Sequence, residues 1–280
     1  MVKQTITVPT RYLITESTSR TLPGGRDVRL GVGFVLKSGR VVDTPLHRPN
    51  GYSAVWCLRG QGTYIAEDGT ETPLVPGSLF HRYTDRQHSN RMVAGSHWAE
   101  AWIVIPVEVE SALRSIGVLD PRRPVQQPGL DLGLVRELHG LLGGIRQAPE
   151  SGLGAVLAQL VGVLTHLCSR DHTSTDPHRI AIDEACRRLG EDPRLDLHRL
   201  AHSLDLSYER FRKIFRQHLG ISPGEYRIRR RIDRARSLLL QHEHSIATIA
   251  TLLGYPNPFA FSAQFKQIVG ESPEHYRKRH

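Results

Sequence analysis

A sequence repeat near the C-terminus constrains the fold of this 280-residue chain more than any other feature. Residues 215–227 have the sequence FRQHLGISPGEYR, and fifty positions later residues 265–277 have the sequence FKQIVGESPEHYR. The Phe, Gln, Gly, Ser, Pro, Tyr and Arg positions are identical in the two copies. An internal repeat of this kind predicts one supersecondary unit that is built twice.

A short amphipathic helix and a turn are predicted before each copy of the repeat. A second helix follows each turn, with Ser207 and Asn257 as N-caps and Pro258 in the first helical position. Helix, turn and helix in this order are typical of domains whose second helix enters the DNA major groove. The apolar positions that predict these helices are Leu197, Leu200, Ala201, Leu204, Phe211, Ile214 and Phe215 in the first unit, and Ile246, Ile249, Ala250, Leu253, Phe261 and Phe265 in the second.

A single long helix is predicted between the two copies, over residues 225–240. Such a helix would hold two helix-turn-helix units a fixed distance apart, and successive major grooves on one face of DNA are about 34 Å apart. Its inward residues are expected to be Tyr226, Ile232, Ala235, Leu238 and Leu239, with most of the arginines outward.

The region from about Ile180 to the C-terminus resembles the DNA-binding domain of AraC-type transcriptional regulators. The motifs that carry the resemblance are Leu200-Ala201, Ile249-Ala250, Gly254-Tyr255, Phe261-x-x-x-Phe265-Lys266 and the two Gly-x-Ser-Pro-x-x-Tyr-Arg endings. The resemblance implies an all-α tandem helix-turn-helix domain over residues 179–280 that binds double-stranded promoter DNA. The alternative is a small helical bundle that binds protein.

Positive charge is concentrated in the same region. Residues 178–280 contain 19 Lys and Arg against 12 Asp and Glu, whereas residues 1–177 contain 18 against 16. A charge excess on elements that also carry a helix-turn-helix repeat favours a partner made of phosphates.

The resemblance also assigns individual DNA contacts, because the outward positions of each second helix are those that family members use. Arg and Lys pair with guanine, Glu accepts from cytosine, and an aromatic ring packs on a thymine methyl, although Phe259 is equally compatible with burial. The expected base contacts are Glu209, Arg212, Lys213, Asn257, Phe259, Ser262 and Ala263, and the expected phosphate contacts are Tyr208, Arg216, Arg227, Arg229, Arg230 and Lys266.

The N-terminal half has the short periodic segments of an all-β domain. Residues 1–25 are rich in Thr, Ser, Pro and Gly and predict an extended arm outside the core. Short strands separated by Gly and Pro turns predict a sandwich or barrel over residues 26–107. The expected strands are 30–36, 52–58, 62–66, 72–74, 78–80, 91–94 and 98–105. The predicted fold class is therefore α+β with two domains.

The strand region resembles the cupin-like jelly-roll sensor domain of the same family, most closely that of the arabinose-responsive member. The matching motifs are Arg48-Pro49, Arg59-Gly-Gln-Gly62, Pro76-Gly77 and Trp98-x-x-x-Trp102. The resemblance carries the family's sugar-contacting positions onto Arg48, Asn90, Glu100 and Trp102. Asn90 replaces an aromatic residue and Glu100 a histidine, so a sugar or sugar acid other than arabinose is expected. The alternative is that Trp102 is core and Arg48 a surface charge.

No catalytic or metal-binding constellation is predicted. Metal-binding cupins use two histidines one residue apart and a nearby glutamate, but this chain has only His47-Arg48-Pro49 at the matching place. His81, His88 and His97 are scattered, and no nucleophile arrangement or phosphate loop is present. We therefore expect no cofactor.

Two amphipathic helices are predicted within a helical region over residues 108–169, from leucine spacing over 130–145 and 153–167. Both would pack on the barrel, and the second has near-heptad spacing that is also compatible with a homodimer seam. Residues 170–178 are polar and without period, which predicts the interdomain linker.

The cysteine pattern and the apolar segments predict a cytoplasmic protein with no membrane partner. Cys57, Cys168 and Cys186 are far apart and form no C-x-x-C motif, which indicates a reducing compartment without a zinc site or disulfide framework. The longest apolar runs are expected to be too short to span a bilayer.

The function predicted is regulation of transcription through DNA binding that responds to a sugar-like effector in the barrel. A homodimer and RNA polymerase are expected as further protein partners. The first alternative is a cupin-type isomerase or dioxygenase with a DNA-binding appendage, and the second is a ligand-independent DNA-binding dimer.

Overall fold

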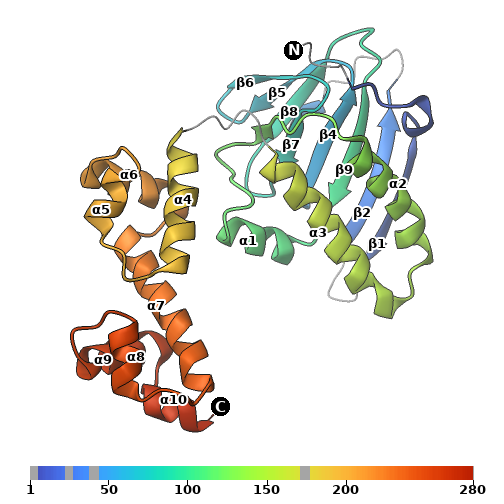
Figure 1. Cartoon of the computed structure of the whole chain (residues 1–280). Coiled ribbons are helices and arrows are strands. Elements are labelled where there is room, and N and C mark those ends of the chain that lie inside the picture. Colours follow the sequence, from blue (N-terminus) through green and yellow to red (C-terminus); the bar gives the residue numbers. More distant parts are fainter. Residues whose placement is uncertain (1–5, 23–27, 38–43, 171–176, 280) are drawn as a thin grey trace. The chain divides into compact units, whose positions relative to one another are not determined.

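The chain divides into two compact units, residues 1–174 (unit 1) and residues 175–280 (unit 2), each described here by itself (Figure 1). The computed structural model describes residues 6–22, 28–37, 44–170 and 177–279. Residues 171–176, which make up most of the predicted linker, lie outside the described residues. The β-rich first region and the helical second region confirm the predicted fold class.

Unit 1 contains two antiparallel sheets. The larger sheet has the strand order β1 (Glu16–Thr21), β2 (Arg29–Leu36), β9 (Ala99–Val104), β4 (Ser53–Arg59), β7 (Leu79–Arg82) and β10 (Val125–Gln126). The smaller sheet has the order β3 (Thr44–His47), β8 (His88–Met92), β5 (Gly62–Ala66) and β6 (Glu71–Leu74). Of these strands, β1, β3 and β10 were not predicted from the sequence.

One face of the larger sheet carries the main core of unit 1. Alternate residues such as Val32 of β2, Trp56 of β4 and Ile103 of β9 are buried on this face, as strand geometry requires. Leu138 and Leu164 from the covering helices belong to the same core. The helices of unit 1 are η1 (Thr10–Tyr12), α1 (Val107–Ser115), α2 (Leu132–Gln147), η2 (Glu150–Gly152) and α3 (Leu153–Ser169) (Figure 1).

The prediction that residues 1–25 form an arm outside the core is wrong for the described part, residues 6–22. Val8, Tyr12 and Leu13 are buried in the core of unit 1, and β1 pairs with β2 along its whole length. Residues along β1 alternate between half-buried and exposed, because it is the edge strand. An edge strand composed of Ser, Thr and charged residues lacks the apolar alternation from which strands are predicted.

Residues Glu150–Ser169 form one helical stretch that is long and apolar enough to cross a membrane by length and composition alone. The expectation that every apolar run is too short is therefore wrong. The core helices of soluble proteins pass the same test, and Leu160, Leu164 and Leu167 are buried in the core of unit 1. The other side of α3 leaves Ala158 and Gly162 exposed, and the homodimer seam there stays a prediction.

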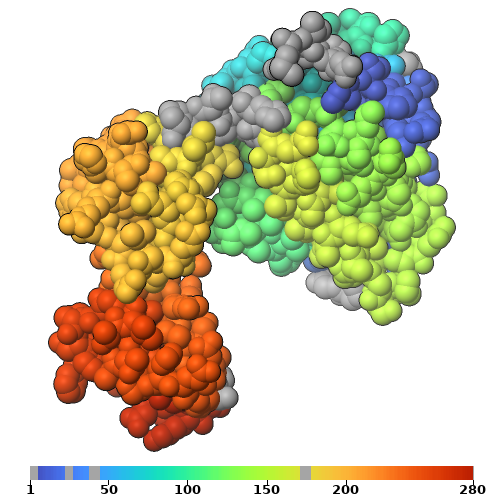
Figure 2. Space-filling model, viewed as in Figure 1, coloured from blue at the N-terminus to red at the C-terminus, as the bar shows by residue number. Residues whose placement is uncertain are grey.

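Unit 2 is all-α and contains two separate hydrophobic cores. Phe211 and Phe215 lie in the first core, and Phe261 and Phe265 lie in the second. The space-filling view shows two corresponding lobes within unit 2 (Figure 2). The helices are α4 (Pro177–Glu191), α5 (Leu197–His202), α6 (Tyr208–Leu219), α7 (Pro223–Leu240), α8 (Ile246–Leu252), α9 (Pro258–Val269) and α10 (Pro273–Arg279).

The repeated residues have the same structural roles in both lobes. Gly220 and Gly270 end α6 and α9 in the left-handed conformation, with φ of 74° and 92°, which a glycine adopts without steric cost. The Ser222 hydroxyl then accepts from Glu225 N at 3.2 Å and caps α7. Ser272 accepts from His275 N at 3.2 Å in the second copy.

The tyrosine and arginine that end each copy of the repeat contact earlier residues of the same lobe. Tyr226 and Tyr276 lie edge-on to Phe215 and Phe265, with ring centroids 5.5 and 5.6 Å apart. The arginine that follows each tyrosine binds the chain just before the first helix of the same lobe. Arg227 Nη1 donates to the Leu195 carbonyl at 3.2 Å, and Arg277 Nη2 donates to the His244 carbonyl at 2.7 Å.

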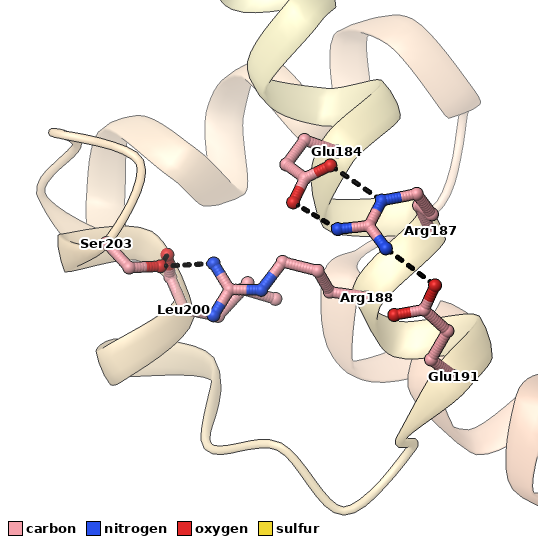
Figure 3. Close-up of polar contacts among 6 residues, drawn as sticks. All are labelled: Glu184, Arg187, Arg188, Glu191, Leu200 and Ser203. Carbon is pink, nitrogen blue, oxygen red and sulfur yellow. Dashed lines mark hydrogen bonds and ion pairs between the residues drawn. The ribbon is translucent and has the colours of Figure 1, made fainter.

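A supporting helix precedes each helix-turn-helix. In the first lobe α4 contributes Ile182, Ala185 and Leu189 to the core, and fifty positions later α7 contributes its own Ile, Ala and Leu. Polar contacts also fix α4 to the end of α5 (Figure 3), because Arg188 Nη1 donates to Ser203 Oγ at 2.8 Å. The structural repeat is therefore longer than the sequence identity indicates.

We predict that residues 175–280 fold without unit 1, since both cores are built from their own side chains. The isolated segment should show helical circular dichroism and cooperative thermal unfolding. Phe265→Ala should lower its free energy of unfolding by about 3–5 kcal/mol, because the ring is fully buried. A segment that is unstructured at 25 °C would contradict the independence of the two units.

Candidate nucleic-acid interface and ligand cavity

Helix α6 has one buried and one polar face. The Ser207 side chain accepts from Arg210 N at 3.3 Å, which confirms the predicted N-cap. Phe211, Ile214 and Phe215 are buried in the first core. The opposite side of the helix exposes Glu209, Arg212, Lys213 and Arg216, all of which were predicted DNA contacts.

Tyr208 begins α6 and packs within the lobe. Its ring is half-buried and stacks on His198 of α5, with centroids 3.9 Å apart. The stacking restricts the orientation of the ring and leaves part of the side chain accessible. Tyr208 therefore lies beside the exposed face of α6 but contributes less surface than its charged neighbours.

Helix α9 exposes a less polar face than α6. Asn257 Oδ1 accepts from Ala260 N at 2.8 Å, so the predicted N-cap is confirmed, and the amide NH₂ of this side chain remains available to a base. Phe259 is 85% exposed, which excludes the alternative that it is buried. The remaining predicted residues are Ser262, which is half-buried, and Ala263 and Lys266, which are exposed.

The arginines of α7 divide into exposed and internal side chains. Arg229 and Arg230 are exposed. Arg229 Nη2 lies 2.7 Å from Glu225 Oε1, and the Arg230 guanidinium lies 5.2 Å from the Tyr226 ring centroid. Arg227 is half-buried and one of its nitrogens donates to a backbone carbonyl inside the lobe, so its part as a phosphate contact stays a prediction.

The face of the larger sheet that lies opposite the main core is its inner face. It contains a cavity of about 280 Å³. Directly paired residues form one row across five adjacent strands at this face. In strand order the row is Ser19, Gly31, Val104, Ser53 and Arg82. The cavity is lined by Ser19, Arg29, Ser53, Arg82, Glu100, Trp102 and Val104.

A glycine on β2 leaves the space that the Trp102 indole occupies in the cavity wall. Gly33 pairs directly with Trp102, and a Cβ at Gly33 would lie 2.5 Å from the Trp102 Cε2 atom. The close approach therefore requires glycine. Trp102 is half-buried and lines the cavity, so it is not purely a core residue.

Glu100 is a buried carboxylate beside Trp102. It is 5% exposed, and its Oε2 accepts from Trp98 Nε1 at 2.5 Å. Its Oε1 lies 3.5 Å from Lys37 Nζ. Burial and the Glu100 charge raise the pKa of the Cys57 thiol, which keeps that neighbour protonated. The carboxylate is thus held in a fixed position at the cavity wall.

The other two predicted effector contacts lie apart from this wall. Arg48 is exposed and lines an adjoining depression of about 320 Å³, which shares Arg29, Ser53 and Val104 with the cavity. Asn90 is 2% exposed on β8 and lines neither space, although its Oδ1 has no hydrogen-bond partner.

Several lining residues were missed by the sequence analysis, and they share a common reason. Their polar side chains occur in strands where sequence alone does not distinguish the inner face from the outer face. A serine on an edge strand or an arginine after an apolar pair is usually a surface residue. The missed residues are Ser19, Arg29, Ser53, Arg82 and Val104.

Histidines inside unit 1 pack with aromatic and polar neighbours. The His88 ring stacks on Tyr64 with centroids 5.7 Å apart. Burial lowers the pKa of His88 to about 4, with smaller contributions from Arg82 and His47, so the ring is neutral at pH 7. His81 Nδ1 lies 2.7 Å from the Tyr52 hydroxyl. Within the described ranges, no three His, Cys, Asp or Glu side chains gather in a way that could hold a metal ion.

Comparison with known proteins identifies the C-terminal region. Residues 200–279 match the family described as "Helix-turn-helix domain". The arabinose operon regulatory protein of Escherichia coli is 27% identical over 252 residues, which cover 84% of this chain and 83% of that protein. The raffinose operon transcriptional regulatory protein RafR of Pediococcus pentosaceus is 35% identical over 79 residues, or 28% of each chain.

One solved structure is similar in sequence to part of this chain. It is a transcriptional regulator described as having an AraC-type DNA-binding domain, from Chromobacterium violaceum. It is 25% identical, covers 36% of this chain and 92% of that chain, and has a TM-score of 0.34. Together with the tandem helix-turn-helix units of unit 2, the sequence matches show that the C-terminal region of this chain is a helix-turn-helix domain of the AraC type and that most of the chain is similar to arabinose operon regulators.

Proposed function

We propose that the protein binds promoter DNA sequence-specifically through unit 2 and that a small-molecule effector in unit 1 controls this binding. The observation that supports DNA recognition most directly is the exposed polar face of α6, opposite a fully buried apolar face. The polar cavity inside unit 1 supports the effector part of the proposal. This function assigns the protein to the cytoplasm, where promoter DNA lies.

In this proposal α6 makes the principal base contacts. Arg212 and Lys213 would donate to guanine O6 and N7, and Glu209 would accept from cytosine N4. Arg216 and Tyr208 would contact the backbone, as the majority of protein hydrogen bonds to DNA do.

The second lobe would contribute contacts of a different kind. Phe259 presents an almost fully exposed ring at the N-terminal end of α9, and such a ring can pack on a thymine methyl. Asn257, Ser262 and Ala263 surround that end of the helix, with Lys266 one turn further along as a phosphate contact. Sequence discrimination should therefore be stronger at the α6 half of the operator.

The effector is proposed to be a sugar or a sugar derivative. A Trp face packs on the apolar side of a sugar ring, and fixed polar groups bond its hydroxyls in defined directions. Trp102 and Glu100 provide these groups at one cavity wall. Arg48 would add a contact from the adjoining depression, whereas Asn90 lines neither space and could contact only a ligand that extends beyond them.

Arg212→Ala should relax the preference for one base pair and cost about 1–3 kcal/mol of binding free energy, because a bidentate base contact is lost. Selection of binding sites from a random DNA pool would measure the change. Arg187→Ala is a matched control, since Arg187 already pairs with Glu184 and Glu191 on α4 (Figure 3). An unchanged site profile for Arg212→Ala would disprove the assignment of the base-contacting face.

Arg230→Ala and Arg227→Ala should have different effects although the residues are three apart. Arg230→Ala should weaken binding to all sequences alike and reduce the salt slope by about 1, as loss of a phosphate contact does. Arg227→Ala should instead lower the free energy of unfolding by about 1–2 kcal/mol, because the Leu195 carbonyl loses its donor. Salt-dependent binding and thermal melting of both variants would test this. Equal melting temperatures for Arg227→Ala and wild type would contradict the internal role of Arg227.

Calorimetry with pentoses, hexoses and uronic acids should find a ligand for the full-length protein. Trp102→Ala and Arg48→Ala should each weaken its binding by about 1–3 kcal/mol, since each removes a direct contact. Arg91→Ala is the control, because Arg91 is exposed on β8 and lines neither cavity. A ligand whose affinity survives both substitutions in folded protein binds elsewhere.

A further inference from the structure

Arg82 of β7 is a charged side chain inside unit 1 without an anionic partner among the described residues. Its Nε is buried and has no hydrogen-bond partner, and the guanidinium lies 5.5 Å from the Phe80 ring centroid. Burial lowers the pKa of Arg82, and the Glu100 carboxylate partly offsets this effect. An arginine nevertheless remains charged at neutral pH. The cavity wall therefore contains a half-buried, partly desolvated cation.

The nearest acid does not neutralise this cation by direct contact. Glu100 lies close to Lys37 and accepts from Trp98, and within the described ranges no ion pair joins it to Arg82. Arg82 is half-buried, and a partly buried charge that lacks a partner costs free energy in the ligand-free fold, in proportion to its desolvation. The presence of this unpaired guanidinium in the cavity wall is better explained by binding of a ligand than by a contribution to the stability of the fold.

The charges that line the cavity favour an anionic ligand. Two guanidinium groups, Arg29 and Arg82, and one carboxylate, Glu100, line its wall, and Lys37 lies beside that carboxylate. An arginine can bind a carboxylate through two parallel charge-assisted hydrogen bonds. The same wall offers hydroxyls at Ser19 and Ser53 for further polar contacts.

We infer that the cavity binds a carboxylate-bearing polyol, with Arg82 holding the ligand carboxylate and Glu100 accepting from a ligand hydroxyl. This inference rests on the effector site proposed above and narrows its ligand from sugars in general to sugar acids. Arg82 thereby becomes the residue that distinguishes an acid from the corresponding neutral sugar.

Calorimetry of the full-length protein with two matched pairs of probes tests the inference. The pairs are glucuronate with glucose and galacturonate with galactose, which differ only in the carboxylate. At least one acid should bind roughly 10- to 100-fold more tightly than its neutral partner. Arg82→Gln should remove most of that difference and leave neutral-sugar affinity within about threefold, whereas Arg82→Lys should recover part of it. Arg91→Gln, on the exposed side of β8, should change neither.

Melting of the ligand-free variants provides the second measurement. Arg82→Gln should melt at the wild-type temperature or above it, because it removes a half-buried charge that has no partner among the described residues. A decrease of more than about 4 °C would show that Arg82 has a structural partner and would overturn the inference.

The binding results separate the two proposals. If neutral sugars bind as tightly as the acids, or if Arg82→Gln weakens both equally, the inference fails but the sugar effector stands. If none of the four probes binds the wild-type protein, the inference fails, and the sugar effector fails as well if the pentoses and other hexoses also do not bind.

Discussion

Helix α7 has to contribute to two hydrophobic cores at once, and the arrangement of unit 2 depends on this constraint. Near its start, Tyr226 packs on Phe215 of the first lobe, and from Ile232 onward its apolar residues belong to the second lobe. The helix has 18 residues, which corresponds to a length of about 27 Å. Because both lobes are packed on one continuous helix, the separation of α6 from α9 cannot change without breaking a core. A rigid separation suits contact with successive major grooves on one face of DNA.

The sequence repeat could be predicted to be structural because its residues have roles that are local in the chain. Gly220 ends a helix and Ser222 begins the next, and helix signals of this kind can be recognised from the sequence alone. The role of Arg227 could not be predicted in the same way. Its partner is a carbonyl 32 positions away, and nothing in the composition of α7 distinguishes this arginine from the exposed Arg229 and Arg230.

In unit 1, too, strands with local signals could be predicted from the sequence, whereas features that depend on distant partners could not. The strand over residues 62–66 was predicted with correct bounds, because glycine turns at Gly60 and Gly69 lie on either side of it. β1 was missed because it is a polar edge strand whose place in the sheet comes from pairing with β2 and not from an apolar alternation of its own. Of the proposed sugar contacts, Glu100 and Trp102 were expected from the resemblance and line one cavity wall together. Arg82 was not predicted, because its importance depends on cross-strand neighbours.

The two units differ in how they use buried polar groups. In unit 2, Arg227 and Arg277 are half-buried and each donates to a backbone carbonyl, which holds each lobe closed, although the Nε of each has no partner. On the inner faces of the sheets in unit 1, Arg82, His88 and Asn90 each have a buried polar atom without a partner. Unsatisfied groups of this kind cost free energy in the ligand-free state, so any ligand that pairs with them recovers part of that cost. The unpaired groups beside the cavity of unit 1 therefore favour binding of a ligand, whereas the carbonyl bonds of Arg227 and Arg277 in unit 2 favour rigidity.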